Sequence, residues 1–321
     1  MSEPGSQRVE TVAAAETIRG IVDNLGRVVH APDETLRLCV LCLVGEGHLI
    51  LEDFPGVGKT MLAKALARSL DVSFSRMQFT PDLLPSDVTG VNVFNQRSNE
   101  FEFRPGPVFA NLLLVDEINR ASPKTQAALL ECMQEQQVTT DGVTNELDRP
   151  FMVMATQNPI EYEGTYPLPE AQLDRFTMRI AIGYPPLAEE AKMLTEQTAD
   201  PPLDALQPVA NAADAIALAD EAKAIFVEES LNRYVVALLR QTRADTRLYL
   251  GASPRAGIAL LRVAKARALA DGRDFLVPDD VKAIAAAVLA HRLILGPEAR
   301  SSGLGGAAIV TEALEKTPVP V

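Results

Sequence analysis

The sequence predicts an α/β fold in which a parallel sheet lies between helices, followed by a smaller helical domain. Three observations lead to this prediction. Short apolar runs typical of buried strands alternate with helical patterns over the first part of the chain, an order that indicates parallel strands joined by helices. Two segments, 91–103 and 137–147, alternate apolar and polar residues around a turn and predict inserted β-hairpins. From about Pro186 the composition becomes alanine-rich and helical.

The individual elements follow in order along the chain. Residues 1–11 are polar and are expected to be disordered. Helices are predicted over 12–30, 33–44, 59–70, 122–136, 228–243 and 281–292, with a further helix start at Ser253-Pro254. Strands are predicted over 48–51, 72–79, 111–115, 151–156 and 179–182. The chain therefore divides into a disordered N-terminus (1–11), an α/β core (12–185), a helical domain (186–295) and a tail (296–321).

Composition and charge narrow the possible functions. Hydrophobic residues make up 47% of the 321 residues, whereas aromatic residues make up only 5%, so the core is expected to be aliphatic. The net charge of −13 argues against nucleic acid as the main partner, because phosphate contacts need a basic surface. The N-terminus shows no secretory leader, and the most apolar stretch, 36–51, is too short to span a bilayer. A cytoplasmic protein without membrane insertion is expected.

Cys39 and Cys42 form a C-x-x-C pair. Such a pair can bind a metal or carry out redox chemistry, but a zinc site needs four ligands and the third cysteine, Cys132, is isolated. The stretch begins with a helix-start signature, Pro32 followed by two acids, and is then apolar nearly all round, which indicates a buried helix. Two buried thiols one helical turn apart are the preferred interpretation.

A candidate phosphate-binding loop follows the first predicted strand. It consists of Pro55, Gly56, Val57, Gly58, Lys59, Thr60 and Met61. This is most of the consensus G-x-x-x-x-G-K-[ST], with Asp53 at the first glycine position. Backbone N–H groups and a helix N-terminus can bind phosphates, Lys59 can reach the β- and γ-phosphates, and Thr60 can ligate magnesium. ATP and Mg²⁺ are the expected ligands.

Polar residues also follow two other buried strands. Asp116 and Glu117 end the run Leu112–Val115, at the strand edge where open α/β sheets bind ligands. Asp116 is expected to hold magnesium through its water, and Glu117 to orient and deprotonate the attacking water. Asn158 follows another buried strand and is a candidate for contact with the γ-phosphate or that water, the alternative being an ordinary Asn-Pro turn.

Two arginines are candidates for contact with nucleotide. Arg175 lies in L-P-E-A-Q-L-D-R-F and is either a surface charge or an arginine finger that acts on a neighbour's nucleotide. Arg255 lies in the first turn of a helix, where the helix dipole disfavours a cation, so a phosphate partner would account for it.

Taken together, these five motifs resemble the AAA+ superfamily in order and spacing, and the residues around them resemble the MoxR family. The segments that carry the resemblance are L-E-D-F-P-G-V-G-K-T, F-R-P-G-P-V-F-A-N, V-D-E-I-N-R-A, A-T-Q-N-P, E-G-T-Y-P-L-P-E-A-Q-L-D-R-F and G-A-S-P-R-A. The resemblance extends from about Val28 to Arg292, and the Pro-Val-Pro ending fits it. One departure is His30-Ala31, which stands where the family usually has a Gly-Gln pair.

The resemblance implies an AAA+ core with a helical lid and a hexameric ring with nucleotide between subunits. It implies that Asn158 is the first sensor, Arg175 the arginine finger and Arg255 the second sensor. The hairpins at 91–103 and 137–147 would be the helix-2 insert and the hairpin before the first sensor. Proteins of this family are thought to be chaperones or maturation factors for protein clients, often with a partner that carries a von Willebrand factor A domain.

Two other functional classes remain as alternatives. A DNA motor is disfavoured by the net charge of −13 and by Glu100 and Glu102 in the first hairpin. A nucleotide switch that does not hydrolyse is disfavoured by the presence of Glu117 and Arg175. A threading unfoldase would show an aromatic-apolar-Gly loop after the second strand, where this chain reads F-T-P-D-L-L. A protein-remodelling ATPase is the favoured interpretation.

Overall fold

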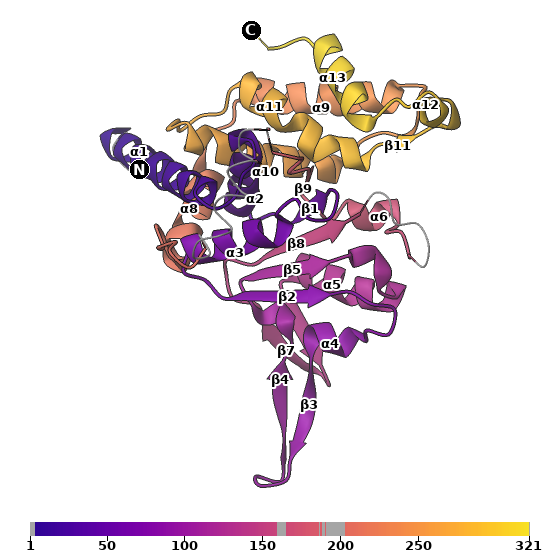
Figure 1. The fold of residues 1–321 in the computed structure, drawn as a ribbon. Helices are drawn as coiled ribbons and strands as arrows, with labels where there is room; N and C mark the ends of the chain where they lie inside the picture. The colour runs from indigo at the N-terminus through magenta and orange to yellow at the C-terminus, as the bar shows by residue number, and fades with distance from the viewer. Residues whose placement is uncertain (1–3, 159–164, 186, 188–189, 191–202, 321) are drawn as a thin grey trace.

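The computed structural model of the chain describes residues 4–158, 165–185, 187, 190 and 203–320, with side chains from residue 11 onward. In Figure 1 the C-terminal helices lie at one end of the molecule, the sheet in the middle and two hairpins toward the other end. The predicted start of the helical domain, at residue 186, lies outside the described residues, as do Pro159 and residues 163–164 of the quoted motifs.

Five parallel strands form the central sheet, in the order β2-β5-β8-β1-β9. Their bounds are β1 (Leu49–Glu52), β2 (Phe74–Gln78), β5 (Leu112–Asp116), β8 (Met152–Gln157) and β9 (Met178–Ile180). The predicted parallel sheet is confirmed. Because β8 lies between β5 and β1, the chain segments that follow these three strands are neighbours at the carboxyl edge of the sheet.

Helices cover both faces of this sheet. Successive side chains of a strand point to opposite faces, and Leu49 and Leu51 pack into one apolar cluster whereas Ile50 packs into the other. The first face is covered by α1 (Pro4–Gly26), α2 (Asp33–Val44), α3 (Lys59–Ser69) and part of the C-terminal helical region. The second face is covered by α4 (Pro85–Thr89) and α5 (Pro123–Glu135). Strands β1, β5 and β8 are thus apolar and buried on both faces, as the sequence pattern indicated, whereas β2 is only partly buried.

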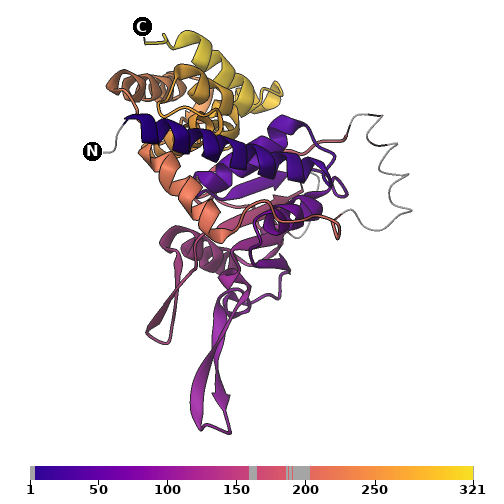
Figure 2. The same ribbon diagram turned by 90° about the vertical axis from the view of Figure 1, so that its left-hand side faces the viewer.

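Two β-hairpins project from the α/β layers, as predicted. The first is β3 (Gly90–Asn95) with β4 (Glu100–Pro105), and the second is β6 (Gln137–Thr140) with β7 (Val143–Glu146). Asp141 and Gly142 both have positive φ, which is the geometry of the tight hairpin turn that this dipeptide favours. The Asn92 Nδ2 group donates a hydrogen bond to Asp141 Oδ2 at 2.7 Å. The hairpins are therefore linked, and Figure 2 shows them extending from the same end.

The C-terminal region is helical, with a short antiparallel pair of strands. Its elements are α8 (Ala212–Ala224), α9 (Glu229–Ala244), β10 (Leu248–Leu250), α10 (Pro254–Ala270), α11 (Pro278–Leu289), the short 3₁₀ helix η3 (Ala290–Arg292), β11 (Ile294–Leu295), α12 (Pro297–Ser301) and α13 (Gly306–Lys316). Ser253 caps α10, since its hydroxyl accepts a hydrogen bond from the Ala256 amide at 3.2 Å, as the Ser-Pro pair predicted.

Two predictions about the chain ends need correction. The segment expected to be disordered is helical from Pro4 onward, since α1 begins there and continues through residue 11. The segment expected to be a tail after residue 295 instead forms α12 and α13. Ile309, Val310 and Ala313 form an apolar stripe along α13 that is buried against the helical region. The Gly and Pro residues of this segment separate short helices.

The cysteine pair lies in α2 and is fully buried. Burial raises the pKa of the Cys39 thiol to about 12 and raises that of Cys42 well above its usual value, so both are protonated at neutral pH. The interpretation as two buried thiols one helical turn apart is confirmed. Within the residues described, the helices include none with the length and apolar character that a bilayer crossing requires.

Candidate functional site

The candidate phosphate-binding loop connects β1 to α3, as the sequence predicted. Gly56 and Gly58 have φ of +86° and +94°, in a region where a side chain would be strained, so glycine is required at both positions. The helix begins at Lys59 directly after Gly58. Its first N–H groups have no partner within the helix and, with the positive end of the helix dipole, form a site for an anion.

Asp53, at the position of the missing glycine, holds this loop in place. Its side chain is 5% exposed, and its two carboxylate oxygens accept hydrogen bonds from the amides of Phe54 at 2.8 Å and Gly183 at 2.6 Å. Its carbonyl oxygen accepts a hydrogen bond from Lys59 Nζ at 2.5 Å. Asp53 therefore connects the loop to the segment after β9 and holds the lysine, a role that motif comparison missed.

The two acidic residues lie at the end of β5, next to the end of β8. One hydroxyl, that of Thr156 on β8, donates to Asp116 Oδ1 at 3.2 Å and accepts from the Glu117 amide at 2.9 Å. Glu117 has a φ of 56°, a left-handed conformation that is uncommon outside glycine and often found at functional sites. Thr156 thus fixes both residues, a role that the motif A-T-Q-N-P did not predict, since it pointed only to Asn158.

Two arginines pair with these carboxylates. Arg76 Nε on β2 lies 2.7 Å from Asp116 Oδ2, and Arg120 Nη1 lies 2.7 Å from Glu117 Oε2. Asp116 is 8% exposed, so its pairing with Arg76 offsets part of the desolvation of its charge. The one feature of the sequence that could have pointed to Arg76 is its place as a charged residue within a predicted strand.

Asn158 follows β8 at the same carboxyl edge and is half-buried. The strand order puts it between the phosphate-binding loop after β1 and the acidic residues after β5. The structure therefore brings Lys59, Thr60, Asp116, Glu117 and Asn158 to one edge of the sheet.

Arg175 lies at the opposite edge of the sheet. It precedes β9, whose first residue, Met178, is in register with Leu49, the first residue of β1. Because the two strands are parallel, Arg175 is at the amino edge, whereas Lys59 is at the carboxyl edge. Arg175 lines a hollow of about 370 Å³ together with residues of α5, including Glu131 and Glu135. It is not brought together with the phosphate-binding loop of its own chain.

Arg255 is exposed in the first turn of α10, in the C-terminal helical region. The cap residue Ser253, two positions earlier, donates a hydrogen bond to Asp174 Oδ2 at 3.2 Å. The start of α10 therefore contacts the segment that carries Arg175.

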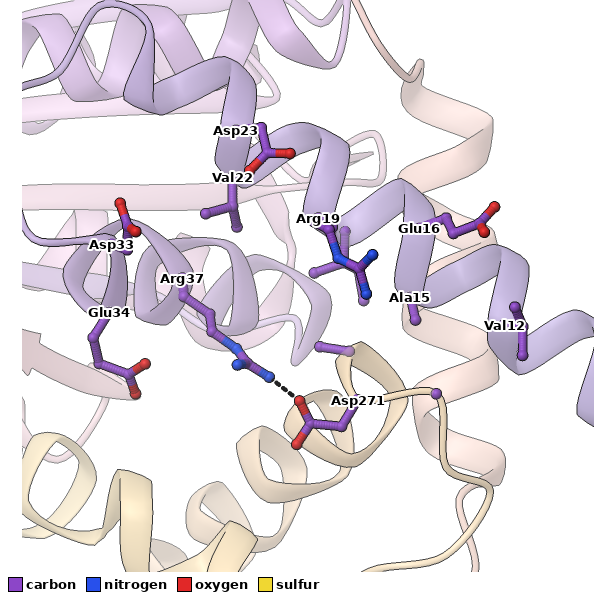
Figure 3. A pocket seen from close by; sticks show the side chains of 13 residues that line it. Val12, Ala15, Glu16, Arg19, Val22, Asp23, Asp33, Glu34, Arg37 and Asp271 are labelled. Carbon is purple, nitrogen blue, oxygen red and sulfur yellow. Dashed lines mark hydrogen bonds and ion pairs between the residues drawn. The ribbon is translucent and has the colours of Figure 1, made fainter.

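A pocket of about 610 Å³ lies elsewhere, between α1, α2 and the end of α10 (Figure 3). Arg37 on α2 pairs across it with Asp271, which follows α10. No residue of the phosphate-binding loop lines it. This cavity is therefore separate from the candidate site. The candidate site is an open edge of the sheet, formed by backbone N–H groups and carboxylates.

Comparison with known proteins agrees with this geometry. The family described as "ATPase family associated with various cellular activities (AAA)" matches residues 48–178, and the AAA lid domain matches residues 240–313. A solved structure of a proposed ATPase from Cytophaga hutchinsonii is similar, with a TM-score of 0.91 and 39% identity over 99% of both chains.

Three relatives are similar over most of the chain. An uncharacterised protein, YeaC of Bacillus subtilis, is 49% identical and covers 94% of each chain. Chaperone MoxR1 of Mycobacterium tuberculosis is 39% identical over 96% of this chain and 84% of its own. Protein MoxR of Methylorubrum extorquens is 33% identical over 85% of this chain and 86% of its own. The chain therefore belongs to the MoxR family of AAA+ ATPases.

Proposed function

We propose that this protein binds ATP with Mg²⁺, hydrolyses it to ADP and phosphate, and uses the energy to remodel a protein client. The observation that carries the proposal is the convergence of a glycine-bearing loop, Lys59 and the Asp116-Glu117 pair at one edge of a parallel sheet. A phosphate-binding loop beside a strand-end carboxylate pair is the arrangement that phosphoryl transfer to water requires.

The reaction needs a water held in line with the γ-phosphorus. Glu117 is assigned as the group that orients this water and takes its proton, while a P–O bond forms to the water oxygen and the bond to ADP breaks. Lys59 and the amides of the loop stabilise charge on the β- and γ-phosphates. Asn158 is assigned a contact with the γ-phosphate or the water, and Arg255 a contact with nucleotide from the lid.

The donor set fits magnesium. The Thr60 hydroxyl and the Asp116 carboxylate are hard oxygen ligands, which Mg²⁺ prefers, and it usually takes only one or two protein groups beside phosphates and waters. The part of the chain that the structure describes holds no cluster of three metal-ligating His, Cys, Asp or Glu side chains, in keeping with a metal held mainly by nucleotide. Bound magnesium would neutralise charge on the phosphates.

A ring of subunits, expected to be a hexamer, would complete the site. Since Arg175 lies at the amino edge of its own sheet, its action on nucleotide requires a neighbouring subunit, and we assign it as an arginine finger in trans. Such an interface is heterologous, and repeated around an axis it closes into a ring.

A protein client is supported by the projecting hairpins. Phe101 on β4 is 73% exposed and Val143 on β7 is 61% exposed, and apolar side chains exposed on a projection fit contact with another polypeptide. The relative named Chaperone MoxR1 fits this role. A von Willebrand factor A domain partner is part of the proposal, and nucleic acid is not, given the net charge of −13.

The central test is phosphate release by the purified protein with Mg²⁺ and ATP, with Lys59→Ala as the control. The expected result is turnover that Lys59→Ala abolishes together with ATP binding. If Lys59→Ala turned over ATP as fast as wild type, or bound ATP with an affinity within a few-fold of wild type, the assignment of this loop as the ATP site would be wrong. A several-fold stimulation by DNA at physiological salt would favour the DNA-motor alternative. Capture of proteins with a Glu117→Gln trap would identify the client.

A further inference from the structure

The segment that carries Arg175 is held by buried side chains of the C-terminal helical region. Arg292, at the end of η3, has a side chain that is 3% exposed. Its Nε donates to Asp174 Oδ1 at 2.7 Å and its Nη2 donates to the carbonyl oxygen of Phe176 at 2.7 Å. Its Nη1 donates to the carbonyl oxygen of Thr177 at 3.0 Å. One guanidinium thus contacts residues on both sides of Arg175.

Two further side chains complete this contact. The Ser253 hydroxyl donates to the second carboxylate oxygen of Asp174 at 3.2 Å. The His291 Nε2 atom lies 3.1 Å from the Phe176 carbonyl oxygen, and burial lowers the pKa of His291 well below its usual value. A neutral His291 must carry its proton on Nε2 to make this bond. We call Asp174, Ser253, His291 and Arg292 together the clamp.

The polar and charged side chains of the clamp are not needed merely to hold two regions together, because apolar packing could do that. Arg292 is buried and Asp174 is half-buried, and an ion pair withdrawn from water is costly to desolvate and is a weak source of stability compared with packed apolar side chains. A planar guanidinium, in contrast, fixes several oxygen acceptors in a defined geometry that lysine cannot reproduce. Because Asp174 and Phe176 flank Arg175, this geometry sets the position of the Arg175 main chain.

We propose that Arg292, with Asp174 as its ion-pair partner, is a positioning residue that aims Arg175 at the nucleotide of the neighbouring subunit. This inference rests on the proposed function. It has a consequence for communication around the ring: Ser253 belongs to the same helix start as Arg255. A nucleotide that Arg255 contacts is thereby linked, through Ser253 and Asp174, to Arg175 of the same subunit, which acts on the nucleotide of the next subunit.

Arg292→Lys tests the proposal, because it keeps the charge but cannot hold a carboxylate and two carbonyl groups at once. We expect ATP affinity within about twofold of wild type and turnover reduced at least tenfold. The matched control is Arg273→Lys. Arg273 forms an ion pair with the buried carboxylate of Asp280 at 2.6 Å, and its other contacts are with Asp271 and Phe275, not with the segment that carries Arg175. It is expected to lower stability without this loss of turnover.

Mixed rings separate positioning in trans from a structural defect. Lys59→Ala subunits cannot bind ATP but offer an intact clamp and Arg175. When they are added to Arg292→Lys subunits, turnover per Arg292→Lys subunit should rise severalfold, because some of its sites now face a well-positioned finger. A damaged nucleotide site or lid within the Arg292→Lys subunit would not be rescued in this way.

Arg175→Ala subunits mixed with Lys59→Ala subunits serve as the reference. If Arg175→Ala is rescued and Arg292→Lys is not, the clamp does not position the finger. If neither is rescued although both co-assemble, the finger assignment in the proposed function fails and the clamp role fails with it. Should Arg292→Lys not fold, Asp174→Asn takes its place in the same mixtures, since it removes the ion pair from the other side.

Discussion

The main-chain amide of Gly183 donates a hydrogen bond to the carboxylate of Asp53 at 2.6 Å, joining the phosphate-binding loop to the segment that follows β9. The other carboxylate oxygen accepts from the Phe54 amide at 2.8 Å. The ring of Phe54 also stacks on that of Tyr184, with centroids 5.7 Å apart. A residue that interrupts the motif consensus is therefore one that fixes the geometry of the loop.

Restoring the consensus should weaken the protein. Asp53→Gly removes a buried, charged acceptor from two amides, and hydrogen bonds to charged groups contribute about 1.5–3 kcal/mol. We expect the free energy of unfolding to fall by about that amount and ATP affinity to fall about tenfold, since a freer loop must be ordered on binding. Denaturant unfolding and a nucleotide titration measure both.

The matched control is Asp71→Gly. Asp71 is exposed with a φ of 47°, where glycine is the less strained residue, so this change should be neutral or slightly stabilising. Equal stability and ATP affinity in Asp53→Gly and wild type would mean that the loop keeps its geometry without the Gly183 contact.

Glu117→Gln should bind ATP but hydrolyse it very slowly. The amide keeps the shape of the side chain and removes the base, and general base catalysis typically contributes 10²- to 10⁴-fold. Rings should persist with ATP, because nucleotide between subunits is bound and not consumed, and size-exclusion chromatography with ATP detects this. An unchanged rate of phosphate release would show that another group takes the proton.

Stability should fall in mild acid because of His48. Its Nδ1 accepts from the Val153 amide and its Nε2 donates to the Met133 carbonyl, both at 3.0 Å, so the ring is neutral. Burial lowers the pKa of His48 from 6.5 to about 4. The unfolded chain therefore binds the proton more tightly than the folded one. The contribution of the neutral ring to the free energy of unfolding is fully present above about pH 6.5 and is lost as the pH falls to about 4, a decrease of about 3 kcal/mol.

A comparison with His48→Gln isolates this contribution. Glutamine keeps one donor and one acceptor but does not titrate, so the two proteins share every other acid-sensitive group. The difference between their free energies of unfolding should shrink as the pH is lowered from 6.5 to 4. A difference that stays constant over this range would mean that His48 is not the titrating group.

Much of the fold was predictable because local signals agree with it. The runs of β1, β5 and β8 are short and apolar on both faces, and Asp141-Gly142 has the backbone preference that a tight turn needs, so these elements were predicted with small boundary errors. The predictions for the two chain ends were wrong. The polar residues 4–11 predicted disorder but form part of α1. After residue 295, the Gly and Pro residues predicted a tail, although the apolar stripe of α13 lies among them.

The candidate site was predictable only as far as its residues follow strands. Asp116 comes directly after an apolar run, Asn158 lies shortly after one, and Lys59 belongs to the glycine-bearing loop that follows one, so the strand pattern and the loop motif together predicted them. The supporting residues have no such signal: Arg76 is 40 positions from Asp116, and Arg292 is 118 positions from Asp174. Their roles depend on which strands and helices become neighbours in the folded chain, and local sequence patterns do not reveal which elements those are.

Arg175→Ala should retain ATP binding and lose nearly all turnover. An arginine finger contributes about 10³- to 10⁵-fold in rate, or roughly 4–7 kcal/mol of barrier. The loss should occur at a site in the next subunit, because Arg175 precedes β9 at the amino edge of its sheet and Lys59 follows β1 at the carboxyl edge. A finger that acted within its own chain would have to cross the sheet.

Mixing two inactive variants distinguishes these possibilities. Lys59→Ala subunits cannot bind ATP but offer Arg175, whereas Arg175→Ala subunits bind ATP but offer no finger. At equal amounts and random assembly, roughly a quarter of the interfaces in a ring combine an intact loop with an intact finger. Those interfaces should restore measurable ATPase activity, although tight coupling around the ring would reduce it. If the variants co-assemble and no activity returns at any ratio, Arg175 does not act in trans; if Arg175→Ala alone is fully active, Arg175 is a surface charge.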